Sequence, residues 1–355
     1  MRNLLLPFLL ILSFIFSCRS ESDGLLEEKF NSYDVYVAGI ENNEACYWKN
    51  NIKTVLTGGS GITPYKIIVE NNDVYVLAAS NAAPQNYYIW KNNVKINVDQ
   101  YIGMNSNTGT ISQYGHSIQD FQVDQGNIYL FGIVSSPVVQ LPNGVNYYTI
   151  ELCYWKNGIK TVLFTRTPDF NQPHVTYRNF IVSNGNVYVP INKFLNKITD
   201  SPYELGYFKN NTYHTIASYS DYKSFNHISK GTNNSIYISI NDNINNNTYY
   251  KNITTNTDSY LSQTNKTKFN IDGNDLYEFS NVQNYLKNDV PVSSAYALDF
   301  KHVDDLAALN QNVYQIRSKW TNDAAVSYKV YINNTETQQI NATNGVFKSI
   351  FVDPN

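Results

Sequence analysis

Two neighbouring stretches decide the fold: Asp34-Val35-Tyr36-Val37-Ala38-Gly39, and shortly after it Ala45-Cys46-Tyr47-Trp48-Lys49-Asn50. The first predicts a short β-strand centred on a tyrosine, because β-branched and aromatic residues favour strands. The second predicts an aromatic strand that ends in an Asn-containing turn. Nearly the same second stretch returns as Leu152-Cys153-Tyr154-Trp155-Lys156-Asn157. The chain is therefore predicted to contain copies of one structural unit.

The tyrosine strand occurs seven times, usually after another short strand and a tight turn. The central residues are Tyr36, Tyr75, Tyr129, Tyr188, Tyr237, Tyr277 and Tyr314, at spacings of 39, 54, 59, 49, 40 and 37 residues. An aromatic strand, a turn such as Asn92-Asn93 or Lys251-Asn252, and a fourth strand follow. Asn tolerates the left-handed backbone that two-residue hairpins require. Four antiparallel strands in each repeat predict a β-propeller blade.

The two ends of the chain favour a closed ring over the alternative, an open solenoid. The copy at Tyr36 has no strand before it, and residues 346–355 match such a strand with no tyrosine strand after them. The two halves would complete one blade and remove the free edges that a solenoid must cap. We therefore predict an all-β, seven-bladed β-propeller of four-stranded antiparallel blades over residues 33–355. The C-terminal strand is expected to close the ring on the N-terminal blade.

Residues 1–17 predict export from the cytoplasm. Arg2 precedes an apolar stretch over residues 4–16, too short to span a bilayer and typical of a signal peptide. Ile15-Phe16-Ser17-Cys18 resembles the lipobox of bacterial lipoproteins, which implies lipidation at Cys18. The alternative is a soluble secreted protein whose signal peptide contains a cysteine. The predicted organisation is a signal peptide at 1–17, a flexible tether at 18–32 and the propeller at 33–355.

The charge of the chain argues against a nucleic-acid partner, and the positions of its cysteines argue against a disulfide. Lys and Arg total 26 against 29 Asp and Glu, so nothing electrostatic favours binding to nucleic acid. Asn, with 51 residues, and Tyr, with 30, fit many short strands joined by tight turns. Cys46 and Cys153 occupy the same position of the first and third repeats. A disulfide needs Cα atoms within ~7 Å, so we expect both thiols to be free.

The loops divide between the two faces of the predicted disc. We name the strands of a blade a to d from the axis outward, with the tyrosine on b, so that loops b–c and d–a share one face. Almost all insertions fall there, in blades two to four: residues 79–87, 99–118, 133–151, 165–177 and 191–205. Function concentrates on loops held by a rigid scaffold, so we predict that this face binds a partner. Neutral loop growth is the alternative.

The candidate binding residues on these loops are polar or aromatic: Tyr101, His116, Tyr147, Tyr148, Arg166, Asp169 and His174. Trp320, in the b–c loop region of the last blade, is a further candidate. The histidines lack metal-ligand spacing and no nucleophile or phosphate-loop motif occurs, so we expect no metal, no cofactor and no catalytic residue. Asp304-Asp305 is interpreted as a guard of a strand edge. A set of aromatic residues recurs at one position of strand c: Trp48, Trp90, Trp155, Phe208 and Tyr250. This regular recurrence favours packing between blades over stacking on a sugar.

The strand repeats and the lipobox together resemble the seven-bladed propeller lipoproteins of Bacteroidota. The resemblance implies a lipid-anchored monomer of the bacterial cell envelope, at the outer membrane. Propellers host many unrelated activities, so the resemblance does not identify a function. We favour a non-catalytic scaffold that binds a protein or a glycan. The alternative is a hydrolase or lyase that acts on a polysaccharide in the propeller funnel.

Overall fold

A computed structural model gives the structure of the protein. The chain divides into two compact units, residues 1–34 with 353–355, and residues 35–352, which form the propeller. The structure describes residues 33–82, 85–104, 115–136, 139–140, 146–147, 149–166, 173–194, 204–218, 223–242, 244–262, 268–279, 285–292, 299–333 and 335–354.

Seven antiparallel sheets form the blades, and six of them have four strands each. From the axis outward, the first three blades are β31 (Gly345–Pro354), β1 (Tyr33–Glu41), β2 (Glu44–Lys49), β3 (Ile52–Ser60); β4 (Ile62–Glu70), β5 (Asp73–Ser80), β6 (Tyr87–Lys91), β7 (Val94–Asn97); and β8 (Gly115–Asp124), β9 (Asn127–Ser135), β12 (Ile150–Lys156), β13 (Ile159–Arg166).

The fourth blade has an inner strand in two pieces, β14 (His174–Tyr177) and β15 (Ile181–Ser183), which both pair with β16. Its other strands and the last three blades are β16 (Asn186–Phe194), β17 (Glu204–Lys209), β18 (Thr212–Ser218); β19 (Lys223–Lys230), β20 (Ile236–Asp242), β21 (Asn247–Asn252), β22 (Thr257–Ser262); β23 (Lys268–Asp272), β24 (Asp275–Phe279), β25 (Leu286–Lys287), β26 (Val290–Pro291); and β27 (His302–Leu309), β28 (Asn312–Thr321), β29 (Ala324–Ile332), β30 (Thr335–Asn341). The connections carry a hairpin, β10 (Val139–Gln140) with β11 (Asn146–Tyr147), and one short helix, α3 (Val98–Tyr101).

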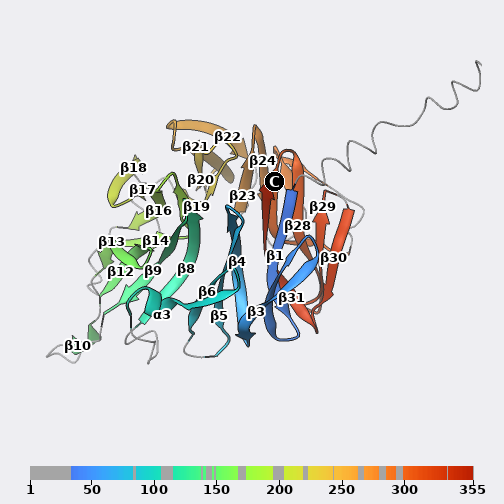
Figure 1. Cartoon of the computed structure of the whole chain (residues 1–355). Helices are drawn as coiled ribbons and strands as arrows, with labels where there is room; N and C mark the ends of the chain where they lie inside the picture. The colour runs from blue at the N-terminus through green and yellow to red at the C-terminus, as the bar shows by residue number, and fades with distance from the viewer. Residues whose placement is uncertain are drawn as a thin grey trace, which may run out of the picture. The chain divides into compact units, whose positions relative to one another are not determined.

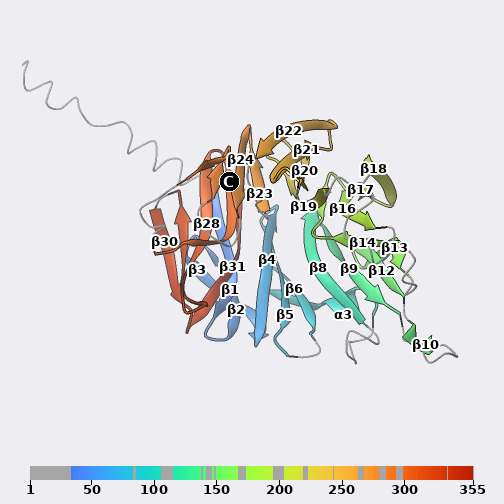
Figure 2. The same ribbon diagram turned by 180° about the vertical axis from the view of Figure 1, so that it is seen from behind.

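The C-terminal strand closes the ring, as predicted. β31 pairs with β1, and Figures 1 and 2 show the dark red C-terminal strand beside the blue N-terminal one. Gly39 on β1 permits this pairing, because a Cβ there would overlap the carbonyl of Val346. On one side of β31, the Ile350 N–H donates to Asp305 Oδ2 at 3.0 Å. On the other, the Ile67 N–H donates to Ser349 Oγ at 3.4 Å. The seven-bladed fold is therefore confirmed, and Asp305 joins two blades rather than guarding an edge.

The recurring asparagine of the c–d turn fastens strand c to strand b. In the third blade, the Asn157 N–H donates to the Ile128 carbonyl at 2.9 Å, and the Ile128 N–H donates back to Asn157 Oδ1 at 3.0 Å. Asn50, Asn92, Asn210, Asn288 and Asn333 make the same pair of bonds in their blades. Each of these asparagines has a positive φ. Asn is retained because it combines a left-handed backbone with a side-chain acceptor.

The lysine before this asparagine accompanies the strand-b tyrosine. Lys49 pairs with Tyr36 across the sheet, and its Nζ lies 5.3 Å from the centre of the tyrosine ring. Lys91 over Tyr75, Lys156 over Tyr129, Lys209 over Tyr188 and Lys287 over Tyr277 repeat the contact at 5.3–5.7 Å. A cation over an aromatic face is favourable. The Tyr and Lys-Asn elements of the repeat are thus partners in one contact.

The strand-c aromatic residues all pack between blades, but Tyr250 faces a different seam from the other four. Trp48, Trp90, Trp155 and Phe208 are buried, and each pairs with the residue that follows the strand-b tyrosine. In the fifth blade Lys251 holds that register position, because Ile238 pairs with Lys251 and Ser239 with Tyr250. A shift of one residue turns a side chain to the other face of a sheet. Tyr250 therefore packs against Phe269 of the sixth blade, whereas the other four residues pack against the preceding blade.

The same shift changes the turn of the fifth blade. β21 ends at Asn252 and β22 begins at Thr257, so the predicted Lys251-Asn252 turn lies further along the chain. There Thr254 Oγ1 accepts the Ile236 N–H, in place of the usual asparagine. The loop-rich face also extends beyond blades two to four, because residues 292–301 separate β26 from β27.

Candidate functional site

A cavity of about 700 Å³ lies on the axis of the ring. All seven inner strands contribute to its lining. Its charged side chains are Lys66, Glu70, Asp120, Asp124, Lys230, Lys268, Asp305 and Lys348. Tyr65 is 45% exposed and Lys348 is also exposed, so solvent reaches the cavity. The volume lies within the ~300–1,000 Å³ that is typical of small-molecule sites.

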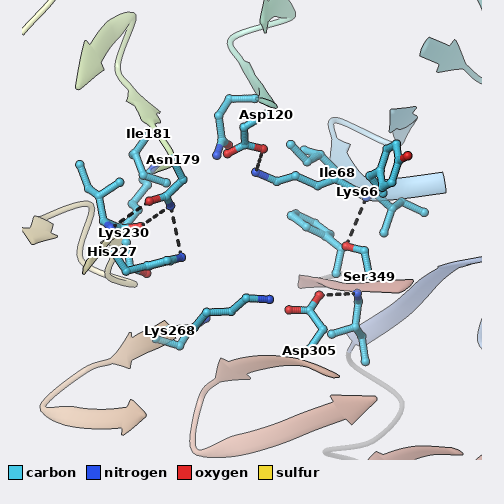
Figure 3. A pocket seen from close by; sticks show the side chains of 18 of the residues that line it. Lys66, Ile68, Asp120, Asn179, Ile181, His227, Lys230, Lys268, Asp305 and Ser349 are labelled. Carbon is cyan, nitrogen blue, oxygen red and sulfur yellow. Dashed lines mark hydrogen bonds and ion pairs between the residues drawn. The ribbon is translucent and has the colours of Figure 1, made fainter. Parts of the chain in front are cut away.

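Each carboxylate of the cavity has a structural partner. Asp120 pairs with Lys66 at 2.7 Å across the seam between β8 and β4, as Figure 3 shows. Glu70 accepts the backbone N–H groups of Gln125 and Gly126, at 2.7 and 2.6 Å. Asp124 and Asp305 likewise accept backbone N–H groups of a neighbouring blade. These carboxylates therefore join adjacent blades.

His227 on β19 is a poor general base in this setting. Asn179 Nδ2 lies 3.2 Å from His227 Nε2 and also donates to the Ile228 carbonyl at 3.0 Å (Figure 3). With the amide in this orientation, Nε2 accepts a hydrogen bond and the ring is neutral. Burial, together with the charges of Lys268 and Lys66, lowers the pKa of His227 to about 3. A base this weak takes up few protons near neutral pH.

A second hollow of about 410 Å³ lies between the third and fourth blades, and we call it the interblade groove. Its lining is mainly apolar: Gln119, Ile133, Ile150, Leu152, Phe164, Arg166, Val175, Thr176 and Tyr177. These residues lie near the ends of strands b and d and the starts of strands c and a. The interblade groove is therefore on the predicted loop-rich face. Arg166 is the one charged residue in its lining.

His116 is buried rather than displayed. Its Nε2 lies 3.0 Å from Asp99 Oδ1, and both side chains are almost wholly buried. Burial lowers the pKa of His116, and the charge of Asp99 opposes that shift. The pair connects α3 to the start of β8 beside Tyr87, whose ring centroid is 6.1 Å from that of His116. His116 therefore has a packing role within the blade seam.

The other described candidates are dispersed. Tyr101 is half-buried in α3, where its carbonyl lies against Gly158 of the β12–β13 turn. His174 stacks on Phe194 at 4.6 Å. Trp320 is 45% exposed at the end of β28, and its ring lies tilted against that of His302, with centroids 5.0 Å apart. Its indole N–H donates to Ser318 Oγ at 2.8 Å. Only Arg166 lines one of the two hollows, so the candidates do not form one cluster.

Of the remaining candidates, only Tyr147 lies among the described residues. Tyr147 lies in β11, paired with Val139. Tyr148, Asp169 and Cys18 lie outside the described residues. The central lysines Lys66, Lys268 and Lys348 were not among the predicted site residues, although Lys66 and Lys348 lie in inner strands expected from the sequence. A charged residue in a strand next to the axis could have indicated a polar site there.

The described residues show neither a cluster of metal ligands nor a membrane-spanning helix. They contain no group of three or more His, Cys, Asp or Glu side chains placed to hold a metal ion. Within the same part of the chain, no helix has the length and apolar character needed to cross a membrane.

Comparison with known proteins finds similarity among solved structures and none among family models or curated sequences. No known protein family and no curated protein sequence matches the chain. Among solved structures, apo AztD from Citrobacter koseri is similar over 90% of this chain and 98% of its own, with 10% identity and a TM-score of 0.48. An acylaminoacyl peptidase from Pyrococcus horikoshii is similar over 86% of this chain and 50% of its own, with 10% identity and a TM-score of 0.47.

Proposed function

We propose that this protein is an exported, lipid-anchored scaffold that binds a protein partner at the interblade groove. The observation that carries the proposal is the composition of the groove on the loop-rich face. Ile133, Ile150, Leu152 and Val175 supply branched aliphatic walls, and Arg166 supplies a cation with no ion-pair partner among the described residues. Apolar hollows with one charged group suit an inserted apolar side chain beside a carboxylate.

A glycan partner is less well supported by this lining. Sugars need several polar groups and a flat aromatic face. The groove has two aromatic residues, Phe164 and Tyr177, but its aliphatic side chains outnumber its polar ones. The strand-c tryptophans that could have stacked on sugars are buried. A protein that inserts one apolar side chain therefore fits the groove better.

The chain offers two isoleucines of the third blade as a matched pair of test sites. Ile150 lines the groove, whereas Ile159 is 75% exposed beside the c–d turn on the opposite face. Immobilised wild-type, Ile150→Asp and Ile159→Asp proteins would be incubated with envelope extract, after equal melting temperatures are confirmed. We expect one defined protein to bind wild-type and Ile159→Asp and to be lost with Ile150→Asp.

Retention of that protein by Ile150→Asp, or binding of none, would contradict the assignment of the groove. Binding of a purified glycan by both variants would show that a glycan is recognised elsewhere.

The proposed anchor at Cys18 has a separate test. The support is the lipobox-like Ile15-Phe16-Ser17-Cys18 after an apolar stretch. Acyl chains attached to one residue can supply stable anchoring. Labelling of expressing bacteria with a fatty acid should mark the wild-type protein and leave Cys18→Ala unlabelled. Equal label in both would reject lipidation at Cys18.

A further inference from the structure

The axial cavity has an uneven distribution of charge. Glu70, Asp124 and Lys230 are at the strand ends that lead into the a–b turns. The rest of the cavity contains Lys66 and Asp120, which neutralise one another, and then Lys268, Lys348 and Asp305. Two ammonium groups thus face one carboxylate in this part of the cavity.

The single carboxylate is already engaged. Asp305 Oδ2 accepts the Ile350 N–H at 3.0 Å, the bond that helps to close the ring. Neither Lys268 nor Lys348 has a carboxylate within ion-pair distance among the described residues. Figure 3 shows Lys268 extending into the open space between the inner strands, with Asp305 beside it.

The field of Lys268 reaches groups on both neighbouring strands. On β19, its charge adds to burial in lowering the pKa of His227. On β27, burial raises the pKa of Asp304, and a hydrogen bond from Ser318 and the charges of His302, Lys348 and Lys268 oppose that shift. The strand that carries Lys268, β23, packs between β19 and β27. The ammonium group of Lys268 is placed to meet a ligand in the cavity.

We propose that the axial cavity binds a small organic anion, with the ammonium groups of Lys268 and Lys348 as its charged hydrogen-bond donors. The volume of about 700 Å³ admits a molecule of the size of a sugar acid. Gln119 and Asn270 are in the lining and can hydrogen-bond a polar body. The Asp305 carboxylate disfavours a second negative charge on the ligand. The site therefore suits a monoanion with a polar, uncharged body.

Calorimetric titration with D-glucuronate tests the site, with D-glucose as its neutral counterpart. The variants are Lys268→Gln, Lys348→Gln and, as a control, Lys301→Gln, because Lys301 is exposed and outside the cavity. We expect wild-type and Lys301→Gln to bind glucuronate alike. Lys268→Gln should bind at least about tenfold more weakly, the effect of losing one charge-assisted hydrogen bond. Glucose should bind at least about tenfold more weakly than glucuronate to the wild type.

Lys268→Arg keeps the charge and should retain most of the binding, which separates loss of charge from loss of folding. The melting temperature of every variant would be measured alongside. Equal glucuronate affinity in wild-type and Lys268→Gln would overturn the proposal. So would equal affinity for glucose and glucuronate, or the absence of heat at millimolar glucuronate.

Discussion

At the residue scale, the asparagine of the c–d turn shows why the repeat keeps Asn at this position. Asn157 combines a φ of 49° with an acceptor for the Ile128 N–H and a donor to Asn127 Oδ1 at 2.8 Å. Asn and Asp tolerate the left-handed backbone better than other residues with a β-carbon, but an ionised Asp lacks the donor and Gly has no side chain.

Replacement of Asn157 tests this account. Asn157→Ala should lower the free energy of unfolding by about 2–3 kcal/mol, from two lost hydrogen bonds and left-handed strain. Asn157→Asp keeps the acceptor for Ile128 and should lose about half as much. Urea unfolding of the three proteins gives the values. A loss below about 0.5 kcal/mol in Asn157→Ala would show that the turn bonds contribute little.

The two repeat cysteines give a second prediction at this scale. Cys46 and Cys153 are free and buried, as the sequence analysis expected. Burial is the main cause that raises the pKa of each thiol to about 12. The thiolate is the reactive form, so alkylation of the native protein at pH 8 should be about a thousandfold slower than that of a free thiol.

Iodoacetamide labelling of a protein that begins at residue 33 would measure this, since it removes Cys18. Two thiols should react in denaturant without reductant and almost none in the native state. Rapid native labelling would contradict the burial, and absence of thiols in denaturant would reveal a disulfide.

At the element scale, each seam between blades has its own polar link. Between the fifth and sixth blades the Tyr250 hydroxyl donates to Glu278 Oε1 at 2.6 Å, and both side chains are buried. The sequence places these residues 28 positions apart, in strands of different repeats. Glu278 departs from the repeat, which has Val or Ile after most strand-b tyrosines. That departure could have indicated a special partner but not its identity.

The Tyr250–Glu278 link should contribute measurably to stability. Tyr250→Phe leaves the buried carboxylate with one donor fewer and should cost about 1.5–3 kcal/mol of unfolding free energy. Tyr260→Phe is the control, because its hydroxyl makes only a 3.3 Å bond at the surface. Glu278→Gln, which keeps an acceptor, should cost less than Glu278→Ala. Equal stability of Tyr250→Phe and Tyr260→Phe would show that the Tyr250–Glu278 hydrogen bond does not stabilise the seam.

Some elements of this molecule could be predicted from the sequence, and others could not. The tyrosine strands, the asparagine turns and the closing strand follow from local patterns with a fixed spacing, so they were predictable. The inner-strand irregularities at Tyr65, Gln119, Asn226 and Asp304 were not, because a bulge depends on the partner strand.

The sites were harder to predict than the fold. His116 was expected at a loop surface, yet it is buried against Asp99. The axial cavity depends on Lys66, Lys268 and Lys348 from three different blades, which only the closed ring brings together. Side chains that meet across a seam share no local pattern in sequence.

At the scale of the whole molecule, stability depends on closure. Each of the seven hydrophobic clusters draws buried residues from two adjacent blades. Phe347 and Ile350 of β31 belong to the cluster that joins the seventh blade to the first. Trp48 packs edge-on against Phe347, with ring centroids 5.0 Å apart. Removal of β31 would therefore expose the first blade and both of its seams.

The most direct test of the closed ring compares two C-terminal truncations. Deletion of residues 346–355 removes almost all of β31, whereas deletion of 353–355 leaves Phe347, Ile350 and their cluster in place. Burial of one such side chain is worth about 1.5–3 kcal/mol, against a total stability of about 5–15 kcal/mol. Thermal unfolding should show the shorter deletion melting within a few degrees of the intact protein. The longer deletion should aggregate or melt at least about 15 °C lower, and a melting temperature close to that of the intact protein would contradict closure by β31.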